Sequence, residues 1–239
     1  VGGFVSVQLF NGFTPSDTAN LVNHSDSRIL YTEKATFDKM DFDGIPEIIA
    51  AIECNSGELL ASRGNFADLY AERDRIFAEA HPSWSPTDIN FDVRGLDEIA
   101  AIMYTSGSTG NPKGVMLTNR NFSANVAEVP NHFPFHRGEN YVSVLPYAHI
   151  FGLTVDMLIP MCLGMHLVVL GLPPVPTFLK PALREYNPRL FFAVPLILTK
   201  MLEDTIGEFM HSKGGAAKLE EHEKHEDFCE ALATIFMKA

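Results

Sequence analysis

A short apolar run, IAAIMY at residues 99–104, leads directly into a polar segment, and this pair constrains the fold most strongly. Short continuous apolar runs are typical of parallel strands that are buried on both faces. The polar segment, YTSGSTGNPKG at residues 104–114, contains hydroxyls, glycines and one lysine but almost no apolar side chain. The sequence therefore predicts a buried strand that ends in a polar, glycine-rich loop.

The loop has the chemistry of a phosphate cradle. Its glycines allow the backbone to take positive φ angles and to turn several N–H groups toward one point, where they can hold an anion. Lys113 adds a positive charge. Hydroxyl donors come from Thr105, Ser106, Ser108 and Thr109, and the glycines are Gly107, Gly110 and Gly114. A flexible surface turn is the alternative, but this composition directly after a buried strand favours phosphate binding.

The spacing differs from that of two well-known phosphate loops. A P-loop has a lysine that follows glycine and precedes Ser or Thr, whereas Lys113 follows Pro112 and precedes Gly114. The dinucleotide pattern GxGxxG is also not matched, because Gly107 and Gly110 stand alone. The mismatch disfavours a P-loop hydrolase.

Composition limits the class of protein. A chain of 239 residues with 46% hydrophobic content is long enough to bury a substantial core. It has 18 Lys and Arg against 30 Asp and Glu, a net charge of -12 that disfavours nucleic acid as a partner. The cysteines Cys54, Cys162 and Cys229 are few, odd in number and far apart, which predicts a reducing compartment and a cytoplasmic location.

One long apolar run, IFGLTVDMLIPMCLGMHLVVLG at residues 150–171, has about the length of a membrane span. Asp156 and His166 interrupt it, and Pro160 with Gly164 divides it. An acidic residue within a membrane is costly, so the run predicts a buried helix followed by a strand. No transmembrane segment is predicted, and peripheral membrane contact is left open.

Strand-like and helix-like segments alternate along the chain. The pattern predicts an α/β fold, with a mainly parallel sheet flanked by helices in each of two lobes. The polar HRGEN at 136–140 marks the predicted boundary, which gives subdomains at 1–137, with the loop at 104–114, and at 138–239, truncated at its C-terminal end. The predicted strands are residues 4–9, 28–32, 48–52, 99–104, 115–117, 141–145, 166–170 and 190–194.

The first lobe begins with a recognisable helix start. In TPSD, Thr14 suits the N-cap, Pro15 the first helical position and Asp17 the acid of a capping box. A strand, a helix and a strand within residues 4–32 predict a parallel crossover unit.

Residues 104–121, YTSGSTGNPKGVMLTNRN, resemble the signature loop of the adenylate-forming enzymes, a superfamily that includes acyl-CoA synthetases, peptide-synthetase adenylation domains and firefly luciferase. Asn119 stands where many members have His. SVLPYAHIFGL at 143–153 resembles the second substrate-site motif, and FFAVPLIL at 191–198 resembles a segment that lines the acyl pocket. The apolar run after His149 is most similar to that of long-chain fatty acid CoA ligases. The fold so implied is part of the large N-terminal domain of an adenylate-forming enzyme.

The resemblance implies a reaction and its residues. Such enzymes join a carboxylate to the α-phosphate of ATP, release pyrophosphate, and let the thiol of CoA displace AMP. Lys113 and His149 are the implied catalytic residues, and His149 would border the acyl carboxylate and the α-phosphate. The β- and γ-phosphates would be gripped by Thr105, Ser106, Gly107, Ser108, Thr109, Gly110 and Lys113. The acyl substrate would meet His149, Phe151, Gly152, Val194 and Pro195.

The resemblance also implies that ATP, Mg²⁺ and CoA serve the full-length parent, without a tightly bound cofactor or a metal ligand in this chain. His222 and His225 in EEHEKHE fit a solvated helix face better than a metal site. Later family motifs, for adenine, ribose, magnesium and the C-terminal lysine, have no counterpart here. We therefore expect a piece of the N-terminal region of a longer ligase, inactive when isolated.

Two other functions are compatible with the sequence. One alternative to the long-chain ligase is a non-catalytic nucleotide-binding module of the same fold. The other is part of an adenylation domain for another carboxylic acid. The acyl chain length and the oligomeric state are not predicted.

Overall fold

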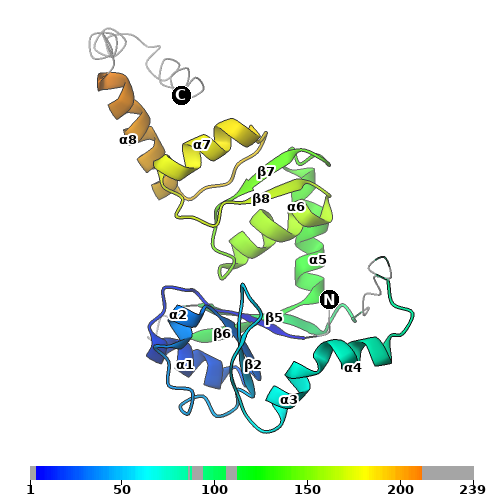
Figure 1. The fold of residues 1–239 in the computed structure, drawn as a ribbon. Helices are drawn as coiled ribbons and strands as arrows, with labels where there is room; N and C mark the ends of the chain where they lie inside the picture. The colour runs from blue at the N-terminus through cyan, green and yellow to red at the C-terminus, as the bar shows by residue number, and fades with distance from the viewer. Residues whose placement is uncertain (1–3, 86, 88–93, 106–111, 212–239) are drawn as a thin grey trace. The chain divides into compact units, whose positions relative to one another are not determined.

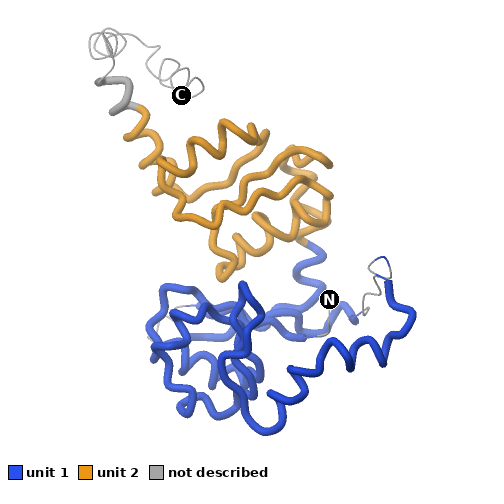
Figure 2. The backbone as a smooth tube through the Cα atoms, in the orientation of Figure 1, with its two compact units in different colours: residues 1–124 blue, residues 125–239 orange. Residues whose placement is uncertain are grey.

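The computed structural model describes residues 4–85, 87, 94–105 and 112–211 (Figure 1). The chain divides into two compact units, residues 1–124 and 125–239 (Figure 2). Helices accompany small sheets in both units, so the α/β class predicted from the sequence is confirmed. The predicted subdomain boundary between residues 137 and 138 stays a prediction.

The first sheet of unit 1 contains the strand that leads into the polar loop. Its order is β1 (Ser6–Gln8), β5 (Ile99–Thr105) and β6 (Lys113–Thr118). β1 runs parallel to β5, and β6 runs antiparallel to it. Ala101 and Met103 of β5 are buried, as expected for the apolar run at 99–104.

The second sheet of unit 1 has the order β2 (Ile29–Thr32), β3 (Ala50–Glu53) and β4 (Leu59–Ser62). β2 is parallel to β3, and β4 is antiparallel to it. The parallel crossover predicted for residues 4–32 is wrong, because β1 pairs with β5 while β2 pairs with β3 in a separate sheet. Residue composition predicts strands but carries no signal for these distant partners.

Helix α1 (Pro15–His24) begins where the sequence predicts. The Thr14 side chain accepts a hydrogen bond from the Asp17 backbone N–H at 3.1 Å and donates its hydroxyl to the Asp17 carboxylate at 2.7 Å. Leu21 and Val22 form the buried side of the helix. The remaining helices that lie wholly in unit 1 are α2 (Lys34–Phe37), α3 (Phe66–Ala71) and α4 (Arg73–Ala80).

Unit 2 is built on two parallel strands, β7 (Asn140–Ser143) and β8 (His166–Val169), with a hydrophobic cluster on each face. Val142 packs with α7 and α8 on one face, whereas Tyr141 packs with η2 and α6 on the other. The helices are α5 (Asn119–Glu128, which begins in unit 1), the 3₁₀ turn η1 (Val129–Asn131), the π-helix η2 (Gly152–Leu158), α6 (Ile159–Cys162), α7 (Pro176–Tyr186) and α8 (Pro195–His211).

The apolar run at 150–171 forms helical turns and then a strand, as predicted. Asp156 lies in η2, Gly164 has a positive φ of 68° between α6 and β8, and His166 opens β8. None of the helices in the described part of the chain is both long and apolar enough to cross a membrane.

The strand predicted at 190–194 is wrong, because these residues pair with no strand in the described part of the chain. Their side chains nevertheless alternate as the sequence indicates. Leu190 and Phe192 pack on the cluster around Tyr141, whereas Phe191 and Ala193 pack on the cluster around Val142. Burial on two sides explains the apolar pattern without a hydrogen-bonded ladder.

Candidate functional site

The β5–β6 hairpin brings the two ends of the polar loop together. The antiparallel register places Thr105 opposite Lys113, and both residues are exposed. A hydroxyl and an ammonium group therefore stand across from each other where the loop leaves and rejoins the sheet. Five predicted cradle residues lie outside the described residues: Ser106, Gly107, Ser108, Thr109 and Gly110.

The strand that enters the loop is fixed to helix α1 through Tyr104. The Tyr104 hydroxyl donates to the Leu21 carbonyl at 3.3 Å and lies 2.8 Å from Nδ1 of His24. Burial raises the pKa of this hydroxyl, which keeps it protonated as a donor. Across the hairpin, a Cβ at Gly114 would lie 3.0 Å from the Ile102 side chain and 3.4 Å from the Tyr104 ring. Only a very small residue leaves that ring in place.

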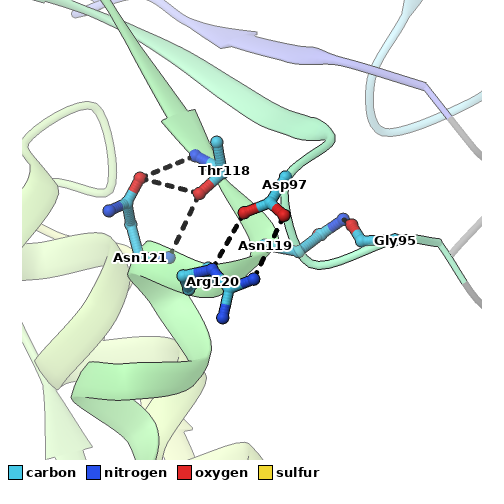
Figure 3. Close-up of polar contacts among 6 residues, drawn as sticks. All are labelled: Gly95, Asp97, Thr118, Asn119, Arg120 and Asn121. Carbon is cyan, nitrogen blue, oxygen red and sulfur yellow. Dashed lines mark hydrogen bonds and ion pairs between the residues drawn. The ribbon is translucent and has the colours of Figure 1, made fainter.

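The strand that leaves the loop is fixed at its far end, where β6 passes into α5 (Figure 3). Arg120 makes a bidentate ion pair with Asp97, at 2.9 and 3.1 Å, and this pair lowers the pKa of the Asp97 carboxyl. The Thr118 N–H and hydroxyl donate to Oδ1 of Asn121, both at 2.9 Å. Asn119, which stands where many adenylate-forming enzymes have His, donates its amide to the Gly95 carbonyl at 3.0 Å. The side chain at this position thus serves a structural contact.

In unit 2, His149 is exposed on the segment that joins β7 to η2. Its Nδ1 accepts a hydrogen bond from the Phe151 backbone N–H at 3.2 Å. Because a backbone N–H can only donate, Nδ1 is the acceptor in this contact, which assigns the ring N–H to Nε2. His149 therefore presents an N–H donor on the side of the ring that faces away from the backbone.

The backbone around His149 is tightly constrained. The His149 N–H donates to the Pro146 carbonyl at 3.0 Å, and the His149 carbonyl accepts from Leu153 at 2.9 Å. Gly152 approaches Pro146 so closely that a Cβ would lie 2.3 Å from the Pro146 carbonyl oxygen. Gly152 is buried, so its role is the close passage of two backbone segments.

Beneath this segment lies Asp156, which is fully buried. Its Oδ2 accepts from the Ser143 hydroxyl at 2.9 Å and from the backbone N–H groups of Val144 and Leu145 at 2.7 and 2.8 Å. Its Oδ1 accepts from the Tyr141 hydroxyl at 2.6 Å. Burial, reinforced by this carboxylate, raises the pKa of Tyr141 far above its usual range, so the hydroxyl stays a donor.

An aromatic cluster brings two of the predicted acyl-site segments together. The rings of Phe151 and Phe192 meet edge to face, 5.8 Å apart, and Phe133 packs on Phe192 at 5.1 Å. Val194 and Pro195 are exposed, and Pro195 opens α8. The residue-by-residue prediction omitted Phe192 and treated Asp156 only as an interruption of an apolar run. An isolated acid in such a run is the available sequence signal for a buried polar contact.

Metal ligands are not clustered within the described ranges, where no group of three or more His, Cys, Asp or Glu side chains is placed to hold an ion. His222 and His225 lie outside those ranges.

These features place the chain in the class of α/β proteins built like the N-terminal domain of adenylate-forming enzymes. Residues 2–233 match the family described as AMP-binding enzyme, and the chain belongs to this family.

Among curated relatives, the chain is 35% identical over 126 residues to probable acyl-activating enzyme 16, chloroplastic, of Arabidopsis thaliana, covering 53% of this chain and 16% of that protein. It is 32% identical over 153 residues to long chain acyl-CoA synthetase 7, peroxisomal, of the same plant, covering 62% and 21%. It is 28% identical over 224 residues to sulfoacetate–CoA ligase of Cupriavidus necator, covering 89% and 40%. The chain thus spans between 16% and 40% of the length of these relatives.

Solved structures share the fold. ATP-bound MatB from Rhodopseudomonas palustris superimposes with a TM-score of 0.62 at 20% identity, covering 83% of this chain and 36% of MatB. The inhibitor-bound N-terminal domain of FACL13 from Mycobacterium tuberculosis gives 0.63 at 21% identity, covering 89% and 47%.

Proposed function

We propose that the chain is part of an ATP-dependent, AMP-forming acid–CoA ligase that activates a long-chain fatty acid. The acid carboxylate attacks the α-phosphate of ATP, pyrophosphate leaves, and the thiol of CoA then takes the acyl group and releases AMP. The observation that carries the proposal is the β5–β6 hairpin, which sets Lys113 opposite Thr105 at the ends of the loop in a chain of the AMP-binding enzyme family.

The hairpin ends suit the triphosphate. Charge on the phosphate oxygens must be held and neutralised as pyrophosphate departs, and donors that are already in place stabilise that charge most effectively. Lys113 provides a cation, and Thr105 provides a hydroxyl. A charge-assisted hydrogen bond at such a position contributes about 1.5–3 kcal/mol. We assign the loop between them, residues 106–111, to the same phosphates.

His149 suits the other end of the reaction. With Nδ1 held by the Phe151 N–H, the imidazole offers its Nε2–H to an oxygen of the acid or of the α-phosphate. Donation from this N–H stabilises the negative charge that develops on those oxygens. We therefore assign His149 to the carboxylate and the α-phosphate.

A long apolar acid is supported by exposed apolar side chains of unit 2. Phe151 is 45% exposed and packs on Phe192, while Val194 is 46% exposed at the start of α8. We assign the acyl chain to this surface, with Gly152 and Pro195. One relative is a long chain acyl-CoA synthetase, but another is a ligase for sulfoacetate, so adenylation of a different carboxylic acid is the second candidate.

The cofactors and location are proposals of the same kind. ATP, Mg²⁺ and CoA would serve the complete protein, meaning the open reading frame that contains these residues. Cys54 and Cys162 are free, exposed thiols, which supports a reducing, cytoplasmic setting.

The test is the exchange of labelled pyrophosphate into ATP by the complete protein, with a panel of acids from acetate and malonate to palmitate. We expect exchange that depends on the acid and is fastest with long chains. If exchange is fastest with a short or doubly charged acid, that acid replaces the long-chain fatty acid as the proposed substrate. Absence of exchange with every acid would instead favour a non-catalytic nucleotide-binding module.

A further inference from the structure

Asp156 is 0% exposed, and its carboxylate receives four hydrogen bonds from uncharged donors. We propose that Asp156 is a positioning residue, which holds the segment from Ser143 to His149 so that the imidazole faces the reacting groups. The assignment of a reaction to His149 rests on the function proposed above.

The geometry shows that this carboxylate redirects the backbone. In a strand, consecutive N–H groups point to opposite sides, toward the two neighbouring strands. Val144 and Leu145 instead direct both N–H groups at the same oxygen of Asp156, at 2.7 and 2.8 Å. β7 ends at Ser143, directly before them. The carboxylate therefore replaces the ladder at the point where the chain must turn toward His149.

The turn is transmitted to His149 by short contacts. Pro146, the next residue after Leu145, accepts the His149 N–H at 3.0 Å and lies against Gly152. Phe151, next to Gly152, holds Nδ1 of the ring at 3.2 Å. Asp156 and Gly152 belong to the same π-helix, a geometry that is frequent at functional sites. Movement of residues 144–146 would thus change both the backbone and the ring contact of His149.

Stability alone is a weak reason for this arrangement. A carboxylate loses its hydration when it is buried, and a well-packed apolar side chain of similar size avoids that cost. Two of the four donors to Asp156 are the backbone N–H groups of Val144 and Leu145, which lie in the connection directly after β7, and the other two are the hydroxyls of Tyr141 and Ser143 in β7. Three of its four donors are in residues 143–145.

The chain supplies a matched control. Tyr141→Phe removes the single hydrogen bond to Oδ1 and leaves the three bonds from residues 143–145 in place. Asp156→Asn keeps an oxygen that can accept from the two backbone N–H groups, whereas Asp156→Ala leaves both without this acceptor. These variants distinguish the loss of the hydrogen bonds between Asp156 and residues 143–145 from a general destabilisation of the core.

The kinetic test uses acid-dependent pyrophosphate exchange by the complete protein. We expect Asp156→Ala to lower kcat about 100-fold, the scale of a misplacement of about 1 Å. Asp156→Asn should recover to within about fivefold of the wild type, and Tyr141→Phe should stay within about twofold. The double variant Asp156→Ala with His149→Ala should be no slower than His149→Ala alone, because both changes remove the same contribution, that of the His149 side chain. Multiplicative effects, or an equal loss in Tyr141→Phe, would overturn the proposal.

A second measurement does not depend on activity. In protein labelled with ¹⁵N at histidine, the wild type and Tyr141→Phe should show the Nε2–H tautomer at His149, whereas Asp156→Ala should show a mixture. If Asp156→Ala does not fold, Asp156→Glu, which displaces the carboxylate by one methylene, should give the same mixture. An unchanged tautomer in the folded variant would overturn the proposal. If the wild type catalyses no exchange with any acid, the function proposed above fails while this readout still decides the role of Asp156.

Discussion

At the scale of single residues, the charge of Lys113 is the simplest quantity to remove. In the complete protein, Lys113→Ala deletes a cation at the hairpin end without touching a buried contact, since the side chain is exposed. The loss of one charge-assisted hydrogen bond, about 1.5–3 kcal/mol, corresponds to an increase of about 10- to 100-fold in KM for ATP. Steady-state kinetics should show a much smaller change in KM for the acid.

Lys39→Ala is the matched control for this change. Lys39 is an exposed lysine of the same unit that is not part of the hairpin. Lys39→Ala removes one positive charge, as Lys113→Ala does, and should leave KM for ATP within about twofold. If Lys113→Ala raises KM for the acid more than KM for ATP, the loop does not bind the phosphates.

Gly152 gives a second prediction for a single residue. A Cβ at this position would lie 2.3 Å from the Pro146 carbonyl oxygen, which is backbone and cannot rotate away. Gly152→Ala should therefore lower the free energy of unfolding by about 1–3 kcal/mol, despite the better helix propensity of alanine. Urea denaturation measures this change, and an alanine variant as stable as the wild type would show that the two segments separate easily.

At the scale of elements, the junction between β6 and α5 contains the Asp97–Arg120 ion pair (Figure 3). Hydrogen bonding to Arg120 lowers the pKa of Asp97 below its ordinary value of 3.8. A carboxyl whose pKa is depressed by folding contributes stability above the unfolded pKa, and this contribution is lost as the pH falls through the folded pKa. We expect Arg120→Gln to return the pKa of Asp97 toward 3.8, measured by NMR titration of the carboxyl carbon.

The same variant should be less stable than the wild type at neutral pH, with a difference that shrinks as the pH falls below about 3.8. Arg75→Gln is the control, because Arg75 pairs with Glu72 and Glu79 around α4 rather than with Asp97. If the titration of Asp97 is the same in Arg120→Gln and in the wild type, the ion pair does not persist in solution.

The elements also show how far local sequence determines the fold. The cap at Thr14, the strand at 99–104 and the division of the 150–171 run follow from signals within a few residues, and the structure has all three. The partners of β1 and β2, and the unpaired course of 190–194, depend on contacts between distant segments, which local composition does not encode. Asp156 belongs to the second group, since its role depends on Ser143, Val144 and Leu145 folding back over it.

At the scale of the whole molecule, the two assigned ends of the reaction lie in different compact units. Thr105 and Lys113 belong to residues 1–124, whereas His149 and the aromatic cluster belong to residues 125–239. Adenylate formation requires the triphosphate and the acid in one geometry, because misplacement of about 1 Å is enough to reduce the rate about 100-fold. The reaction proposed above therefore needs residues from both units.

We accordingly expect the isolated 239-residue chain to show no acid-dependent pyrophosphate exchange, under conditions in which the complete protein is active. The match covers 36% of MatB and 47% of the FACL13 domain, so more than half of each of those structures is not matched by this chain. Circular dichroism of the isolated chain is the control for folding. Turnover by the folded chain would mean that residues 1–239 contain every group that adenylate formation needs, and would assign the adenine, ribose and magnesium contacts to residues of this chain.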